Sequence, residues 1–166
     1  WQAFAGFAAL LVPFTSKVPM AQYLTAVLEL KRRVPLRGQP GVLVTHVGVW
    51  DEEDAPPWMR KAKDGISSQV LLAAMESAGI DMAFVGNYHE HRVWRDGART
   101  IVQVGTLAPG GFGDAGLVDR GLVVTSDGRT FAKHEVPGPR FVVDVGRKQL
   151  ASNVGDQAKN TWFVRQ

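Results

Sequence analysis

Two stretches decide the fold: Val42–His46 reads VLVTH, and Asp81–His91 reads DMAFVGNYHEH. Each begins as a short apolar run of strand length and then passes directly into histidine-bearing positions. Phe7–Pro13 (FAALLVP) is a third such run, and it ends at a proline. Strands that are apolar along their whole length are typical of a sheet covered on both faces. The sequence therefore predicts a buried sheet with polar groups where two of its strands end.

Helical periodicity separates these strands. Met20, Leu24, Val27 and Leu28 recur at helical spacing, which predicts a helix over 20–33. A second helix is predicted over 66–78, ending before Gly79, with a loop over 51–65 between the strand and this helix. The order strand, helix, strand, helix, strand predicts an α/β fold with helices on a mixed sheet.

The pattern changes after His91. Strand-like runs over 99–104, 121–125, 130–136 and 140–145 are separated by Gly, Pro and Asp-Gly turns. Asp127-Gly128 is a strong hairpin signal between two of them. We therefore expect mostly antiparallel strands in the second half, and a flexible connection at Gly110–Gly113.

Composition limits the chemistry that is available. The 166 residues suit one domain, and the formal net charge of +3 allows a polyanionic partner without requiring one. With no cysteine in the chain, thiol catalysis, disulfides and zinc–thiolate sites are excluded. No stretch has the roughly 20 apolar residues that a bilayer requires, so we expect no membrane partner and a cytoplasmic location.

Three of the four histidines lie just past predicted strands: His46, His89 and His91. Ligands gather at the carboxyl ends of strands in helix-covered sheets, and imidazole is a preferred metal ligand where thiolates are absent. Gly48 and Gly86 allow close approach beside them. The alternative is that they are hydrogen-bonded surface residues. The remaining histidine, His134, lies in an alternating run and is expected to face solvent.

At these residues the sequence resembles the calcineurin-like metallophosphoesterases, and most closely their DNA-repair exonuclease branch with its phage relatives. Four segments carry the resemblance, in the family's order: GVLVTHVGV (41–49), MAFVGNYHEHRVW (82–94), IVQVGTLAPGGFGDAG (101–116) and GLVVTSDGRTFAKHEVPGPRF (121–141). The resemblance implies a layered fold and two divalent metal ions, commonly Mn²⁺. It also implies hydrolysis of a phosphodiester, with DNA as the expected substrate.

Carried over residue by residue, the resemblance implies that His46 is a ligand of the second metal and His89 a ligand of the first. Asn87 stands where the family usually has the first His of Gly-His-x-His, so its amide oxygen would replace an imidazole. His91 has no fixed counterpart and is expected either to substitute for that imidazole or to flank the site. Asp51–Asp54 is expected to be a solvated loop that could add an outer group.

Of the family's N-terminal motifs, Asp-x-His and Gly-Asn-His-Asp/Glu do not occur in the sequence, Gly-Asp occurs only after the histidine-bearing segments, at 113–114 and 155–156, and the chain begins at Trp1. We therefore expect residues 1–145 to be the C-terminal half of a metallophosphoesterase domain, and residues 146–166 a tail or the start of an accessory segment. The catalytic residues would lie in the other half. By resemblance, an ATPase subunit or a second copy of the chain is a further expected partner.

Two alternatives stay open. The first is a non-catalytic phosphoesterase-like module with a structural or interaction role, which Asn87 and the absent motifs favour. The second is a small-molecule phosphodiesterase or phosphatase on the same fold, which needs a closed pocket instead of a basic groove.

Overall fold

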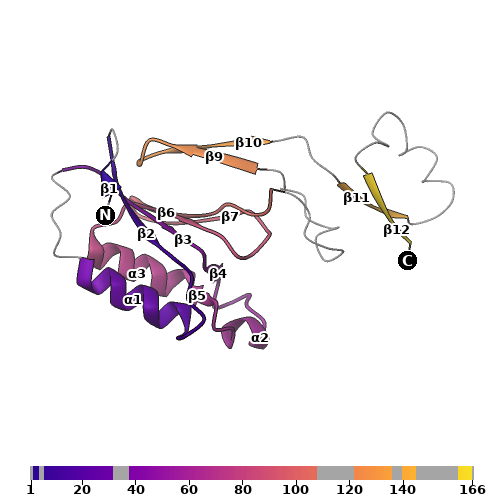
Figure 1. The fold of residues 1–166 in the computed structure, drawn as a ribbon, viewed down its shortest axis with the longest axis horizontal. Helices are drawn as coiled ribbons and strands as arrows, with labels where there is room; N and C mark the ends of the chain where they lie inside the picture. The colour runs from indigo at the N-terminus through magenta and orange to yellow at the C-terminus, as the bar shows by residue number, and fades with distance from the viewer. Residues whose placement is uncertain are drawn as a thin grey trace.

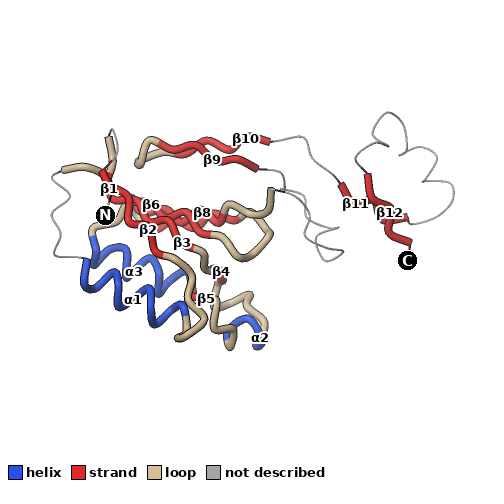
Figure 2. The backbone as a smooth tube through the Cα atoms, viewed as in Figure 1, coloured by secondary structure: helices blue, strands red, loops and turns tan. Residues whose placement is uncertain are grey.

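The computed structural model describes residues 2–3, 6–31, 38–107, 122–135, 140–144 and 161–165. Figures 1 and 2 show the arrangement of the elements. Along the chain these are β1 (Gln2–Ala3), β2 (Ala8–Val12), α1 (Met20–Lys31), β3 (Gly41–Thr45), β4 (Gly48–Trp50), α2 (Pro57–Arg60), β5 (Gly65–Ser67), α3 (Ser68–Ala78), β6 (Met82–Val85), β7 (Arg92–Asp96), β8 (Arg99–Gln103), β9 (Leu122–Ser126), β10 (Phe131–Glu135), β11 (Arg140–Asp144) and β12 (Thr161–Arg165).

A six-stranded mixed sheet forms the centre, in the order β1-β2-β3-β6-β8-β7. Its four inner strands β2, β3, β6 and β8 run parallel, and the two edge strands β1 and β7 run antiparallel to their neighbours. The three strands expected from the apolar runs are β2, β3 and β6, so the mixed α/β class is confirmed.

Helices α1 and α3 lie side by side on one face of this sheet (Figure 2). Leu24, Leu28, Leu71 and Met75 of the helices pack with Leu43 of β3 in one buried cluster. Because alternate strand residues point to opposite faces, one half of each apolar run contributes to this core. The core holds the strand ends in place.

The predicted start of the second helix is wrong. Residues 65–67 form β5, which pairs in parallel with β4, and α3 begins only at Ser68. Ser67 is the N-cap, because its hydroxyl accepts a hydrogen bond from the Val70 amide at 3.2 Å. The predicted end is confirmed, since Gly79 caps the helix with a left-handed φ of 68°.

The expected loop over 51–65 also contains the short helix α2. Pro57 occupies its first turn, where the missing N–H costs no hydrogen bond, and Pro56 precedes it in an extended conformation. The acidic, proline-containing segment therefore includes one helical turn, which contacts β5.

The second half is less antiparallel than expected. β9 and β10 do form an antiparallel hairpin, in which the Asp127 carboxylate accepts from the Arg129 and Thr130 amides at 2.9 and 2.7 Å. These bonds hold the pKa of Asp127 below its usual value. However, β8 is parallel to β6, and β11 is parallel to β12.

β7 is a strand that the sequence analysis did not predict, and the same holds for the short strands β1, β4 and β5 and for β12. β7 carries exposed Arg95 and Asp96, as suits an edge strand, and returns to β8 through Gly97 with a φ of 55°. The chain therefore leaves β6, runs out to the edge of the sheet, and comes back to pair in parallel with β6. The Asp96-Gly97 pair was the turn signal for this path.

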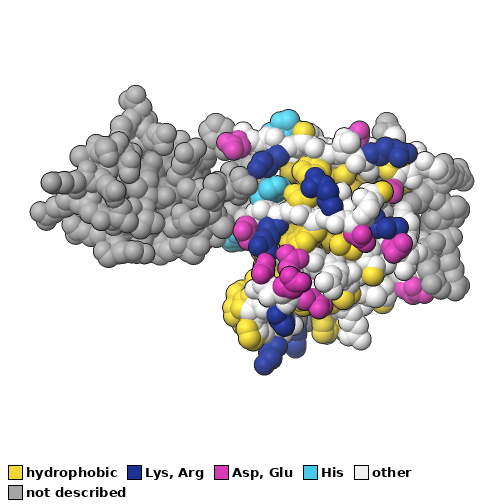
Figure 3. Space-filling view, turned by 180° about the vertical axis from the view of Figure 1, so that it is seen from behind, with side chains coloured by type: hydrophobic (Ala, Val, Ile, Leu, Met, Phe, Trp, Pro, Cys, Tyr) yellow, Lys and Arg dark blue, Asp and Glu magenta, His cyan; other side chains and the backbone are white. Residues whose placement is uncertain are grey.

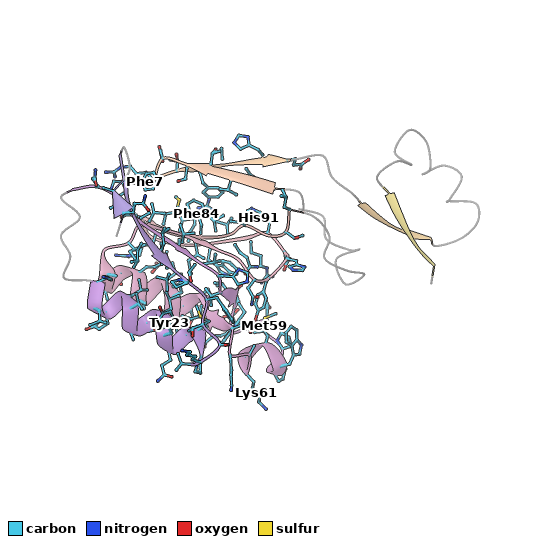
Figure 4. All side chains as sticks on the ribbon, viewed as in Figure 1. Phe7, Tyr23, Met59, Lys61, Phe84 and His91 are labelled. Carbon is cyan, nitrogen blue, oxygen red and sulfur yellow. The ribbon has the colours of Figure 1, made fainter. Side chains whose placement is uncertain are left out.

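The hairpin β9–β10 lies over the sheet face opposite the helices (Figure 1). Phe7 and Phe84 point into the space between them (Figure 4), where an apolar cavity of about 360 Å³ lies. Leu11 and Val44 on the same face are 55% and 40% exposed. This face is thus only partly covered. No helix among the described residues is long and apolar enough to cross a membrane.

Candidate functional site

His46 follows β3 at the carboxyl edge of the sheet. β3 and β6 are parallel neighbours in which Thr45 pairs with Val85, so residues after both strands leave from this one edge. The His46 ring lies against Gly86, where an added Cβ would stand 3.1 Å from Nδ1. The Phe14 ring contacts the imidazole edge-to-face, with centroids 6.1 Å apart. The expectation that Gly86 permits close approach to a histidine is confirmed.

Asn87 follows Gly86 and has an unusual backbone. Its φ of 90° is the only positive value among the described non-glycine residues. Its Nδ2 group donates to the Asp64 carboxylate at 2.9 Å and lies 3.5 Å from the Asp64 carbonyl oxygen. An amide that donates through nitrogen retains its oxygen as an acceptor or metal ligand.

Tyr88 packs over a pair of glycines in β4 and β5. Gly48 and Gly65 face each other in the β4–β5 ladder. A Cβ on Gly48 would lie within 2.6 Å of three Tyr88 ring atoms, and a Cβ on Gly65 would lie 3.0 Å from the hydroxyl oxygen. Burial, and secondarily the Asp64 carboxylate, raises the pKa of Tyr88. The hydroxyl has no hydrogen-bond partner among the described residues.

The rest of the β6–β7 loop is held by β8 and the segment after it. Buried Gln103 joins two segments: its amide group donates to the Glu90 carbonyl at 2.9 Å and accepts from the Val49 amide at 3.1 Å. The Thr106 amide donates to the His89 carbonyl at 3.0 Å. Gly105, with a φ of 84°, lies directly against this backbone. Hydrogen bonds and backbone contacts therefore restrain the loop that carries the predicted ligands at several points.

A cavity of about 480 Å³ opens beside this loop, between it and the 49–59 segment. Its walls include Asn87 and His89 together with the carboxylates of Asp51, Asp54 and Glu90. Arg92 lies 3.6 Å from the Asp51 carboxylate and 3.4 Å from that of Glu90. The rear view shows acidic side chains gathered in the lower middle of that face (Figure 3).

Asp51 has a structural role that its neighbours lack. Its carboxylate accepts from the Trp94 indole at 2.6 Å and from the Ser68 hydroxyl at 2.8 Å. The next three acidic residues, at positions 52–54, are exposed as expected of a solvated loop. Only Asp51 ties the loop to α3 and β7.

The structure brings the predicted ligands to one edge of the sheet but not into one cavity. Asn87 and His89 line the cavity of about 480 Å³, whereas His46 and His91 are not among its lining residues. Figure 4 shows His91 on the hairpin side of the sheet and Met59 on the helix side. The buried Nδ1 of His91 has no hydrogen-bond partner in the described part of the chain. Within that part, no three His, Asp or Glu side chains form a group that could hold a metal ion.

Two other expectations concern residues outside this edge. His134 on β10 is exposed and lies 2.9 Å from the Thr125 hydroxyl, which confirms that it faces solvent. Gly110–Gly113, predicted to be a flexible connection, lies outside the described residues.

Comparison of the chain with protein-family models, with curated proteins and with solved structures finds no match. The site is therefore interpreted from its own geometry. Sequence analysis missed three residues that shape it, namely Asp64, Tyr88 and Gln103. The available signals were Gly48 and Gly65, two glycines within short strands, and a glutamine inside the apolar run IVQV.

Proposed function

We propose that this chain forms part of a metal-dependent phosphodiesterase site, with DNA as the expected substrate. The observation that carries the proposal is the convergence at one sheet edge. His46 leaves β3, Asn87 and His89 follow the parallel neighbour β6, and the His46 ring lies against Gly86 between them. Imidazole and amide donors from adjacent strand ends are the arrangement from which divalent ion sites are built.

Mn²⁺, the ion that the resemblance implies, is a hard divalent ion that favours oxygen ligands such as the Asn87 amide oxygen, so imidazole ligands alone would not select it. Asn87 and His89 line the same cavity and His46 leaves the neighbouring strand end outside it, so the two imidazoles and the amide oxygen would come together only in the presence of the ion and the remaining ligands. When bound, the ions would supply a hydroxide nucleophile and neutralise the charge that develops on the phosphoryl oxygens. The residues of this chain would bind and orient the ions. The absent motifs would supply the remaining ligands.

The sheet face opposite the helices is only partly covered, which supports the view that this is a partial domain. Parallel strands are normally buried on both faces, yet Leu11 and Val44 remain 55% and 40% exposed here. A further layer over this face would bury them. The other half of a phosphoesterase domain would be such a layer.

The first test measures metal binding by the 166-residue chain itself. Three ligands should hold Mn²⁺ only weakly, and His89→Ala should reduce this binding at least tenfold because one imidazole is lost. Asn87→His should tighten it, since imidazole is the better donor. His134→Ala is the matched control, because this exposed histidine lies on the hairpin. Free Mn²⁺ can be quantified by its electron paramagnetic resonance signal. Equal binding by wild type and His89→Ala would refute the site.

The second test concerns turnover. The isolated chain should show no Mn²⁺-dependent hydrolysis of a generic phosphodiester, because it lacks the bridging carboxylate and the catalytic histidine. A polypeptide that also carries the family's N-terminal motifs should be active and should lose activity in His89→Ala. Activity on short DNA in place of small phosphodiesters would separate the nuclease from the small-molecule enzyme.

A non-catalytic structural module is the second candidate. It is favoured by one observation: no group of three metal-ligating side chains occurs in the described ranges. This candidate predicts no Mn²⁺ binding above that of His89→Ala, and no phosphodiesterase activity in a longer chain with every upstream motif intact. The two tests above therefore decide between the candidates.

A further inference from the structure

The cavity of about 360 Å³ between the β9–β10 hairpin and the sheet lies on the face opposite the helices (Figure 1). Its walls come from both layers: Leu11, Val44 and Phe84 belong to the sheet, whereas Val124 and Ser126 belong to β9. Packed protein interiors contain few voids larger than a water molecule. A space of this size instead falls within the range of sites that hold small molecules.

The described residues that line this cavity carry no charge, and all of them except Ser126 are apolar. The Ser126 hydroxyl donates to the Thr130 carbonyl at 2.6 Å and accepts from the Gly128 amide at 3.0 Å. Its single proton is therefore already used within the hairpin. A charged group that entered the cavity would lose its hydration without gaining a partner from this lining. The lining therefore selects an uncharged, apolar molecule.

Two contacts hold the turn end of the hairpin against the rest of the chain. Gly128 in the turn lies against Phe7, since a Cβ added to the glycine would stand 2.6 Å from the Phe7 Cβ. The Arg95 guanidinium of β7 lies 5.8 Å from the centre of the Phe131 ring of β10. The hairpin is thus fixed as a second layer over the sheet, and the cavity lies between two layers.

A small molecule fits this space better than a segment of protein does. The hairpin already occupies the position of the neighbouring layer, which stacks about 10 Å from a sheet. An inserted strand or helix would also bring N–H and C=O groups that this apolar lining cannot pair. Leu11 and Val44 are partly exposed, so the cavity opens to solvent beside them and a ligand can enter there. A further protein layer could close this opening without entering the cavity.

We propose that this cavity binds an uncharged, apolar small molecule with about the volume of a two-ring aromatic compound. An apolar cavity of about 150 Å³ holds one benzene molecule, so about 360 Å³ suits roughly two rings. Water is a poor occupant, because a buried water molecule needs two to four polar partners. The inference does not depend on the proposed function, since His46, Asn87 and His89 are not among the residues that line this cavity.

The probe for the test is N-phenyl-1-naphthylamine, which is uncharged and fluoresces strongly only in apolar surroundings. Titration of the 166-residue chain should give saturable fluorescence with one probe per chain. Naphthalene should displace the probe, whereas naphthalene-2-sulfonate should compete at least about tenfold more weakly because its charge finds no partner. In the ¹³C-labelled chain, the probe rings should shift the methyl signals of Val44 and Val124, and those of exposed Val70 on α3 should stay unchanged.

Two substitutions should weaken binding of the probe by different means. Leu11→Gln places a polar group in the wall and should reduce the affinity about tenfold, because apolar contact with the probe is lost. Leu30→Gln is the matched control, since this leucine is also exposed but lies on α1. Val124→Trp fills the cavity from the hairpin and should abolish saturable binding. The methyl signals of Leu71 in the helix core report whether each variant stays folded.

Three outcomes would overturn the proposal. The first is the absence of saturable binding, or equal binding by wild type, Leu11→Gln and Val124→Trp. The second is equal competition by naphthalene and its sulfonate, which would contradict the uncharged class of ligand. The third is a dimer in sedimentation whose dissociation on dilution is required for the probe to bind, because a second copy would then cover this face. His89→Ala should bind the probe as wild type does, so this proposal and the proposed function stand or fail separately.

Discussion

Gly48→Ala tests the contact that fixes the ligand-bearing loop. The added Cβ would lie within 2.6 Å of three Tyr88 ring atoms. Ordinary contact begins at 3.4 Å and the nearest ring atom would lie at 2.4 Å, so the ring must move by about 1.0 Å. An aromatic ring cannot bend away, and Gly48 lies within a β-ladder. The movement must therefore come from the loop, which carries Asn87 and His89 on either side of Tyr88.

The expected cost follows from overpacking. Inserting one methyl group into a well-packed site costs typically 1–3 kcal/mol. Because Tyr88 is only half-buried, the loop can relax outward, and we expect about 2 kcal/mol for Gly48→Ala. If the ring is first removed by Tyr88→Ala, the same substitution should cost less than about 1 kcal/mol, since the space is then empty. The coupling between the two positions is thus roughly 1–2 kcal/mol.

The measurement is a double-mutant cycle by urea unfolding of the wild type, both single variants and the double variant. Gly79→Ala is a control for the Mn²⁺ measurement: nothing lies within 4 Å of its added Cβ, and its own stability cost comes from the left-handed φ of 68° and not from a side-chain clash. Additive effects of Gly48→Ala and Tyr88→Ala would show that the ring does not occupy this space. Mn²⁺ affinity should fall in Gly48→Ala and stay unchanged in Gly79→Ala.

Three further outcomes are expected. Tyr88→Phe should leave stability near pH 7 little changed. Burial and Asp64 raise the Tyr88 pKa above 10.0, so Tyr88 ionises at a lower pH in the unfolded chain than in the folded one. The free energy of unfolding of the wild type should therefore fall as the pH rises beyond about 10. Urea titrations at alkaline pH should show a smaller fall for Tyr88→Phe. Gln103→Leu should cost about 2–4 kcal/mol in urea unfolding, because it leaves two backbone groups without partners; a cost below 1 kcal/mol would contradict this. Asp51→Ala should lower the melting temperature by several degrees, whereas exposed Glu52→Ala should not.

Local patterns predicted the inner sheet well. The apolar runs at β2, β3 and β6 and the helical spacing in α1 are signals that act within one segment, so they can be recognised without knowing the partners. The errors lie where pairing decides the structure. Gly65–Ser67 is a strand only because β4 lies beside it. β8 is parallel to β6 only because β7 takes the edge position.

The site was predictable in part for the same reason. Histidines after apolar strands are visible in the sequence, and the parallel pairing of β3 and β6 brings them to one edge. The contacts that orient this edge join distant residues, such as Asp64 to Asn87 and Gln103 to Val49. No spacing rule relates these pairs, because each depends on how the loops pack after the sheet has formed.

The loop over 86–91 is more restrained than a connection between two strands requires. Tyr88 restrains it by packing against β4 and β5, Gln103 by a hydrogen bond to the Glu90 carbonyl, and Asp64 by a hydrogen bond from the Asn87 amide. Fixing the backbone in one conformation costs roughly 1–2 kcal/mol of conformational entropy per residue. A loop that only connects two strands does not require this restraint. Because folding has already ordered the loop, binding of a ligand does not have to order it. A weak donor such as an asparagine amide can then serve as a ligand, because it is already in place. This restraint is what we expect of a binding site, and it favours the metal-site proposal over a purely structural module.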